Sequence, residues 1–185
     1  MEEKTIREQL LHLIPEFYEI KNETLREKVI KTWVEAHKKG NWTPEQLARI
    51  PFSLLIKGLE ITFLEHVRAT AKMSAVLHDV LVEHYGNKVT LNRDILLAGA
   101  LIADVGKLLE YKPDAEKGAV KALHGNFLRH PFSSVGLGWE QGLPDEALHI
   151  AAVHSKEGAD FKRTPEAIIF HHADFIDFQI FGGGY

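Results

Sequence analysis

The strongest constraint on the fold is a long apolar stripe whose members recur at steps of three and four residues. Between about Ser53 and His84 the stripe consists of Leu59, Phe63, His66, Thr70, Met73, Leu77 and Leu81. This spacing places side chains on one face of a helix, so we expect a single long helix closing on a C-cap at Gly86. His66 therefore lies in an apolar seam that other helices must cover.

Helix start signals recur along the chain, whereas strand signals are scarce. Residues 43–46 read TPEQ, a capping box with proline at the first helical position, and the Thr-Pro pair recurs at Thr164 and Pro165. Periodicity predicts further helices at about residues 4–13, 23–39, 44–50, 92–110, 131–141, 145–154 and 165–178. Segment 112–125 carries charges, a proline and glycines, so we expect a loop there. These patterns predict an all-α fold.

We expect residues 1–52 to form an N-terminal helical extension packed on the main domain, residues 53–180. Residues 181–185, which read FGGGY, are expected to form a flexible tail. The acidic N-terminus lacks the apolar core of a secretory signal, and no apolar run approaches the roughly 18 residues that span a bilayer. These features predict a cytoplasmic protein with no membrane partner.

Composition narrows the kinds of site that the chain can form. The 185 residues include no cysteine, which excludes disulfides and thiolate metal sites, so a metal would have to bind imidazole and carboxylate. The formal net charge of −4 provides no basic field and argues against duplex nucleic acid as a partner. A small, locally bound anion is compatible with this charge.

Five ionisable residues lie on or at the ends of apolar helical stretches, namely His66, Asp104, His130, His154 and Asp174. A buried charge without a partner costs several kcal/mol. Each residue alone has an ordinary explanation, such as a histidine bonded to the backbone. Together they need mutual compensation, which a divalent cation supplies. A mixed imidazole and carboxylate set favours one or two transition metals (Fe, Mn, Zn, Ni or Co), and the sequence does not choose among them.

The contexts of these residues also occur in a familiar order. They are a His followed two residues later by Arg68, DVGK at Asp104, HPFSSVG at His130, IAAVH ending at His154, and ADFID containing Asp174. Across about residues 60–178 this order resembles the HD-domain superfamily of metal-dependent phosphohydrolases. Within it, the pattern is similar to dinuclear, roughly seven-helix members with two added histidines. The resemblance implies an HD-domain-like helical bundle.

The resemblance also implies a role for each matching residue. His66 matches the first metal ligand, Asp104 the dyad aspartate that can bridge two metals, and Asp174 the closing ligand. His130 and His154 match the pair that holds the second metal. Lys107, one helical turn after Asp104, would face the same site and neutralise a substrate phosphate. Asp104 and Lys107 are thus the expected catalytic residues, and Arg68 is a weaker substrate-binding candidate that a surface salt bridge explains equally well.

The sequence departs from this family at the dyad itself. The family pattern reads His-Asp, and here Ala103 precedes Asp104. The site then lacks one ligand unless another histidine replaces it. His171 is the preferred substitute because it lies three residues before Asp174 on the same helical face. His172 and His124 are alternatives, and the simple vacancy needs the fewest assumptions.

Three functions are compatible with this pattern. The first is a metal-dependent hydrolase of a small phosphate ester, including nucleotides. The second is an HD-fold di-iron oxygenase acting on a small molecule. The third is a non-catalytic HD-related module that binds a partner or nucleotide, which the retention of five candidate ligands disfavours. We expect a small phosphorylated substrate, and a homo-oligomer is left open.

Overall fold

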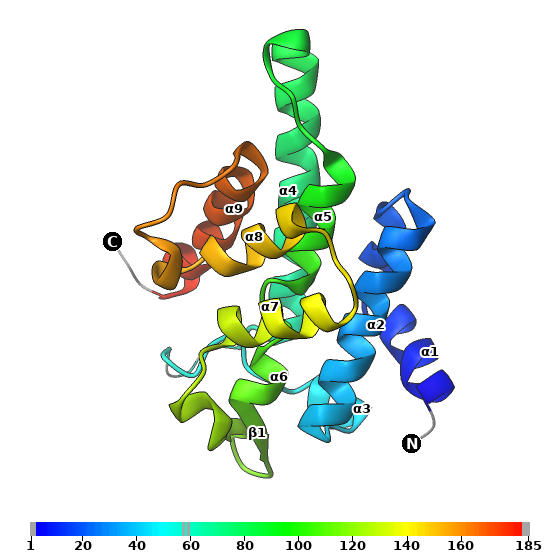
Figure 1. Ribbon diagram of the computed structural model, residues 1–185. Coiled ribbons are helices and arrows are strands. Elements are labelled where there is room, and N and C mark those ends of the chain that lie inside the picture. Colours follow the sequence, from blue (N-terminus) through cyan, green and yellow to red (C-terminus); the bar gives the residue numbers. More distant parts are fainter. Residues whose placement is uncertain (1–2, 57, 59, 183–185) are drawn as a thin grey trace.

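Helix α5 (Arg93–Ile102) lies at the centre of the fold, and α2, α4, α8 and α9 all pack against it. This computed structural model describes residues 3–56, 58 and 60–182, and Figure 1 shows its arrangement. The α-helices are α1 (Glu3–Leu13), α2 (Glu23–Gly40), α3 (Pro44–Leu47), α4 (Phe63–Tyr85), α5, α6 (Lys107–Glu110), α7 (His130–Glu140), α8 (Asp145–Val153) and α9 (Pro165–Gly182). The fold is predominantly helical, as the sequence predicted.

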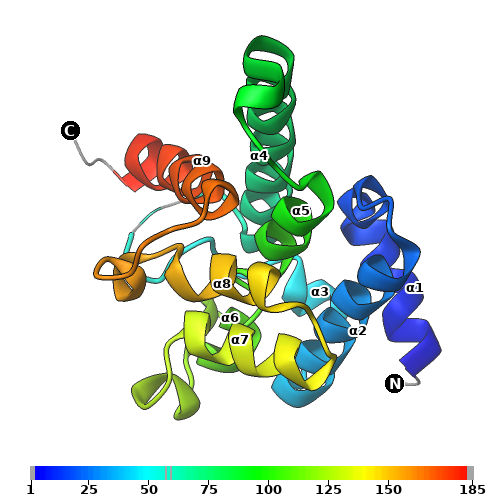
Figure 2. The ribbon, with the colours of Figure 1, turned by 45° about the horizontal axis from the view of Figure 1, so that its top comes forward.

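The composition of α5 explains its central place. Every residue from Leu96 to Ile102 is buried, and a helix that is apolar on all sides must be surrounded by other elements. Asn92 caps its first turn by accepting a hydrogen bond from the backbone N–H of Ile95. Figure 2 shows α4, α8 and α9 grouped around this helix. The chain leaves α5 directly into the segment that carries Asp104.

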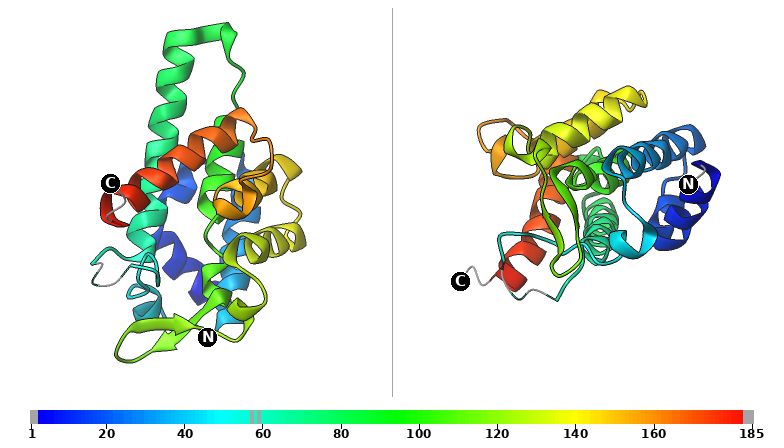
Figure 3. Two further views of the ribbon diagram at one scale, coloured as in Figure 1. Left: turned by 90° about the vertical axis from the view of Figure 1, so that its left-hand side faces the viewer. Right: turned by 90° about the horizontal axis from the view of Figure 1, so that it is seen from below.

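Helix α4 begins at Phe63, about ten residues later than expected. Thr62 and Glu65 form a capping box in which the Thr62 hydroxyl accepts from the Glu65 N–H and the Glu65 carboxylate accepts from the Thr62 N–H. The prediction of a start near Ser53 was therefore wrong, because the TFLE signal sets the start. The far end of α4 projects beyond the other helices (Figure 3).

The predicted helix over residues 92–110 is broken. The chain turns at residues 103–106, and α6 then starts at Lys107. At Gly106 a Cβ would lie 2.3 Å from the backbone oxygen of His130, so the tight approach of α7 accepts only glycine here. Ser134 of α7 holds the turn by accepting from the Gly106 N–H and donating to the Ala103 carbonyl. This turn presents Asp104 toward α7.

The segment expected to be a loop contains an antiparallel hairpin. Strands β1 (Tyr111–Asp114) and β2 (Gly118–Lys121) pair with Tyr111 opposite Lys121 and Asp114 opposite Gly118. Gly118 has φ +74°, a conformation that favours glycine at this turn. Short 3₁₀ turns occupy Pro15–Glu19, Gly86–Lys88, His124–Asn126 and Lys156–Gly158. Helix α3 is also shorter than predicted, because it ends at Leu47 rather than at residue 50.

The N-terminal helices share the core of the later ones. Helix α2 packs against α5, α6 and α7. Two tryptophans, one in α2 and one in the turn after it, form hydrogen bonds with the backbone of α5 and α6 on either side of the 103–106 turn. Trp33 Nε1 donates to the Leu101 carbonyl at 2.7 Å, and Trp42 Nε1 donates to the Leu108 carbonyl at 2.8 Å. The division of the chain near residue 52 stays a prediction.

The expected tail at 181–185 overlaps the end of α9, which extends to Gly182, and residues 183–185 lie outside the described residues. Among the helices of the described residues, none combines the length and apolar character needed to cross a bilayer.

Candidate metal centre

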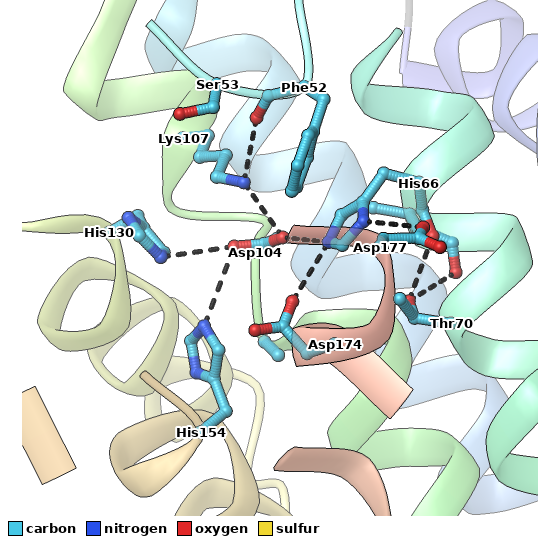
Figure 4. Close-up of polar contacts among 12 residues, drawn as sticks. Phe52, Ser53, His66, Thr70, Asp104, Lys107, His130, His154, Asp174 and Asp177 are labelled. Carbon is cyan, nitrogen blue, oxygen red and sulfur yellow. Dashed lines mark hydrogen bonds and ion pairs between the residues drawn. The ribbon is translucent and has the colours of Figure 1, made fainter. Parts of the chain in front are cut away.

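Five ionisable side chains from separate elements meet at one point, with Asp104 between the others (Figure 4). Asp104 Oδ2 lies 3.1 Å from His66 Nε2, which lies 3.0 Å from Asp174 Oδ1. Asp104 Oδ1 lies 3.1 Å from His130 Nε2 and 3.7 Å from His154 Nε2. The structure thus brings together residues that are spread over α4, the 103–106 turn, α7, α9 and the C-cap of α8. Their role as metal ligands stays a prediction.

Each of the three histidines turns its Nδ1 away from the cluster and onto an oxygen. His66 Nδ1 is 3.1 Å from Asp177 Oδ2, and His130 Nδ1 is 2.8 Å from Glu110 Oε2. His154 Nδ1 is 2.8 Å from the backbone oxygen of Ala151. These acceptors keep a proton on Nδ1, so Nε2 is the nitrogen that faces Asp104 and that a metal would bind in place of a proton. Metal-binding histidines are held in this way.

The charges of the cluster shift its protonation strongly. Burial alone lowers the pKa of His66, but its contacts with Asp104, Asp174 and Asp177 outweigh burial and raise the pKa to about 10. Burial likewise lowers the pKa of His154, but its contacts with Asp104, Asp174 and the Ala151 carbonyl together outweigh burial and raise the pKa. Despite burial, Lys107 and the histidines hold the pKa of Asp104 well below its usual range. The buried carboxylates therefore stabilise positive charge on their neighbours, and either protons on the histidines or bound metal ions can supply that charge.

The positions of the donor atoms are suited to binding a metal, whereas they do not satisfy one another fully by hydrogen bonds. They form two sets around Asp104, one with His66 and Asp174 and one with His130 and His154, and the ligand atoms within each set lie within 4.8 Å of one another. His66 Nε2 is buried and has no hydrogen-bond partner of acceptable geometry, although two carboxylate oxygens lie close. An orphaned nitrogen aimed between carboxylates matches a ligand atom whose partner is a cation. Imidazole with carboxylate suits a divalent transition metal.

Lys107 adds a fixed positive charge beside the cluster. Its Nζ lies 2.9 Å from Asp104 Oδ2 and donates to the Phe52 carbonyl at 3.1 Å. The side chain is buried, and its ammonium lies 4.9 Å from the centre of the Phe52 ring. Burial lowers the pKa of Lys107, but Asp104, Tyr111 and Asp174 together outweigh burial and raise the pKa overall. Lys107 thus remains charged, as its expected role requires.

A cavity of about 670 Å³ opens beside the cluster. Asp104, Lys107, His130, His154 and Asp174 all form part of its lining. Its volume falls within the range of about 300–1,000 Å³ that is typical of small-molecule sites. A molecule that fills the cavity would therefore contact the candidate ligands directly.

Two predicted residues lie elsewhere. The guanidinium of Arg68 pairs with Glu16, with Nε 3.0 Å from Oε2, and Arg68 does not line the cavity. The structure therefore gives no support to substrate binding by Arg68 and agrees with the salt-bridge alternative. His171 is not in either donor set: its Nδ1 lies 2.6 Å from the His154 backbone oxygen. His171 thus contacts the backbone of the candidate ligand His154, and its role as a substitute ligand stays a prediction.

The two other substitutes for the missing dyad histidine are also outside the donor sets. His124 Nε2 lies 2.8 Å from Ser133 Oγ, and His172 is exposed. Ala103 is fully buried at the C-cap of α5. Among the described residues, the set formed by His66, Asp104 and Asp174 therefore has no fourth His, Asp or Glu ligand in the position that a dyad histidine would fill.

Sequence reasoning missed two carboxylates that support the cluster. Asp177 lies three residues after Asp174 in ADFID, so helical spacing already places both on one face of α9. Glu110 lies six residues after Asp104 and accepts from both the backbone N–H and the Nδ1 of His130. Each follows apolar residues in the sequence, LLE at Glu110 and FID at Asp177, which is the signal that identified Asp104 and Asp174.

The chain is similar to a phosphodiesterase. A dihydroneopterin 2',3'-cyclic phosphate phosphodiesterase from Methanocaldococcus jannaschii is 32% identical over 118 residues, which are 63% of this chain and 46% of that protein. The chain thus spans about half the length of this relative. No family model matches the chain, and no solved structure matches it.

Proposed function

We propose that this protein is a metal-dependent phosphohydrolase of the HD type acting on a small phosphate ester. The observation that carries the proposal is the carboxylate of Asp104, which offers one oxygen to each of two donor sets at the wall of a cavity. A carboxylate shared in this way is suited to two neighbouring metal ions, the arrangement that many phosphoester hydrolases use. The similarity to a phosphodiesterase gives independent support.

The residues of each set have distinct tasks in this proposal. His66, Asp104 and Asp174 would hold one divalent metal, and Asp104, His130 and His154 a second. Such metals supply Lewis acidity toward phosphoryl oxygens and lower the pKa of bound water. Asp177 and Glu110 keep the His66 and His130 rings turned with Nε2 toward the cluster. The protein thereby fixes the site before the substrate arrives.

Lys107 is the fixed cation of the site. Phosphoryl transfer builds negative charge on the phosphoryl oxygens, and a preorganised positive charge stabilises it. The Lys107 ammonium is held against Asp104 and the Phe52 carbonyl at the cavity wall. Because both contacts are already made, Lys107 acts through its charge and needs no large movement to do so. Phe52, Phe175 and Phe178 also line the cavity, giving the organic part of an ester an apolar surface.

Within this class, a cyclic phosphodiester is the first substrate to test, because the relative's name specifies one. The test compares hydrolysis of nucleoside 2',3'-cyclic phosphates, an acyclic aryl phosphodiester and an aryl phosphomonoester. Protein is assayed as purified, after chelation, and after reloading with Fe(II), Mn(II), Zn(II), Ni(II) or Co(II). We expect turnover that chelation abolishes and one of these metals restores.

Asp104→Asn is the matched control, since it keeps the side-chain shape and removes the charge that both donor sets share. Hydrolysis that survives both chelation and this substitution would refute the proposal. The same preparations test the alternatives: oxygen consumption with Fe(II) and a co-substrate but no phosphate release would favour the oxygenase. Metal uptake with neither activity would favour a binding module.

A further inference from the structure

Arg129 stands at the boundary between the metal centre and the cavity. It immediately precedes His130, and both residues line the cavity. Its guanidinium lies between two carboxylates, with Nη1 3.3 Å from Glu110 Oε1 and Nε 3.3 Å from Glu157 Oε1. Glu110 is the carboxylate that accepts from His130. Arg129 therefore pairs with Glu110, the carboxylate that orients the candidate ligand His130.

The contacts of Arg129 leave its hydrogen-bonding capacity underused. Its Nε is buried and has no hydrogen-bond partner, and both ion pairs exceed the roughly 2.7–2.9 Å of charge-assisted hydrogen bonds. The shorter contacts of Arg7 Nη2, at 2.7 and 2.8 Å from the two oxygens of Glu27, show what a close pair looks like in this molecule, although Arg7 Nη1 is likewise buried without a partner. A buried donor without an acceptor is costly. Arg129 thus has a buried N–H donor, at Nε, that an added acceptor could satisfy.

The cavity lining holds three lysines besides Arg129, together with four carboxylates, and metal ions bound at the carboxylates Asp104 and Asp174 would tip this balance toward an anionic ligand. Lys107, Lys121 and Lys156 share the lining with Arg129. Lys107 is committed to Asp104 and the Phe52 carbonyl. Lys121 and Lys156 are exposed and form no ion pair within the described ranges. An anion in the cavity would thus have Arg129 and two exposed lysines without ion-pair partners within reach of the same lining.

We propose that Arg129 is a substrate-binding residue that binds the non-reacting oxygens of the substrate's phosphate group. Its planar fork matches two phosphate oxygens at once, which the point charge of a lysine cannot do. On binding, the guanidinium exchanges its long contacts with Glu110 and Glu157 for the phosphate. Glu110 remains bonded to the N–H and Nδ1 of His130, so the donor set keeps its geometry. This inference rests on the proposed function for the identity of its ligand as a phosphate ester.

A purely structural role makes a different prediction. If Arg129 only neutralised Glu110, removing it would disturb His130 and lower metal content, and phosphate affinity would fall only as a consequence. If it binds phosphate, metal content stays constant while phosphate affinity falls. Metal analysis and phosphate binding, measured on the same preparation, therefore separate the two roles without requiring turnover.

The experiment compares Arg129→Gln, Arg129→Lys and the control Arg68→Gln, all metal-loaded. Arg68 is a suitable control because it is also an arginine paired with a glutamate, and it lies outside the cavity. The probe is inorganic phosphate, whose affinity is measured by calorimetry beside metal content. We expect Arg129→Gln to weaken phosphate binding by roughly 10- to 100-fold at unchanged metal content. Arg129→Lys should recover part of this loss, and Arg68→Gln should match the natural protein.

Unchanged phosphate affinity in Arg129→Gln would overturn the inference, as would loss of metal in both Arg129 variants. With a hydrolysed ester, the same substitution should raise KM and also lower kcat, because negative charge grows on the phosphoryl oxygens that Arg129 binds. If no ester is hydrolysed but phosphate binding depends on Arg129, the proposed function fails, and Arg129 stands as a phosphate-binding residue whose ligand is not a hydrolysed ester. If esters are hydrolysed and phosphate binding ignores Arg129, the inference alone fails.

Discussion

His66 and Asp177 are 111 residues apart and meet through a contact of 3.1 Å between Nδ1 and Oδ2. The contact joins α4 to α9 and sets the orientation of the imidazole, because only one ring nitrogen can then face Asp104 and Asp174. His130 and Glu110 repeat the arrangement across α7 and α6. A histidine fixed by a buried carboxylate binds metal with the correct nitrogen already placed.

Asp177→Asn tests this orientation directly. The amide removes the charge behind His66 and can present N–H instead of oxygen to Nδ1, so we expect metal affinity at the set with His66 to fall about 10- to 100-fold. Titration against a competing chelator measures the change. Asp160→Asn, at an exposed aspartate, should leave affinity as it was. Equal affinities for both variants would show that Asp177 does not orient the ligand.

Asp104→Asn tests whether one carboxylate serves both donor sets. Protein purified without chelator should contain about one to two transition metals per chain, with lower occupancy in the set beside Ala103. The substitution should reduce binding at both sets and lower hydrolysis by more than about 100-fold, since it weakens a shared ligand. Elemental analysis with a phosphate-release assay provides the readout. Loss from only one set would contradict the bridging role.

Ala103→His tests the missing dyad ligand. If the position is a simple vacancy, the added imidazole should raise metal occupancy and hydrolysis together. Ala103 is fully buried, so we also expect a packing cost of about 1–3 kcal/mol, seen as a lower free energy of unfolding of the metal-free protein. His171→Ala is the comparison, and it should retain metal because His171 lies outside both donor sets. Metal loss in His171→Ala with no gain in Ala103→His would instead identify His171 as the substitute.

Gly106→Ala tests the turn that presents Asp104. A Cβ there would lie 2.3 Å from the His130 backbone oxygen and 2.8 Å from the Ser134 nitrogen, so α7 must move away from the turn. We expect a loss of about 1–3 kcal/mol in the free energy of unfolding, together with weaker metal binding.

The control for this turn is Gly136→Ala on α7. No atom lies within 4 Å of a Cβ at Gly136, so the substitution should be neutral or stabilise the helix by up to about 1 kcal/mol. Denaturant unfolding of both variants measures the difference. Similar stability changes in the two variants would show that close packing at Gly106 does not hold the turn.

The sequence alone determined the helical character of the chain and five residues of the candidate centre. Periodicity and capping are local properties, so the helices near residues 23–39, 145–154 and 165–178 follow from the letters alone. The burial of His66 and Asp104 follows equally from their apolar neighbours, because placing an ionisable group in an apolar stripe requires compensation wherever the stripe packs.

Only the tertiary structure decided which groups compensate one another. Helical spacing places Asp174 and Asp177 on one face, but it does not indicate that Asp174 faces Nε2 of His66 while Asp177 faces Nδ1. The turn at Gly106 depends on the approach of the His130 backbone, which is distant in sequence. The partners of the arginines depend on tertiary packing in the same way: Arg68 pairs with Glu16, whereas Arg129 lines the cavity. A side chain's partner depends on which elements pack beside it, and that packing is settled by the whole core rather than by neighbouring residues.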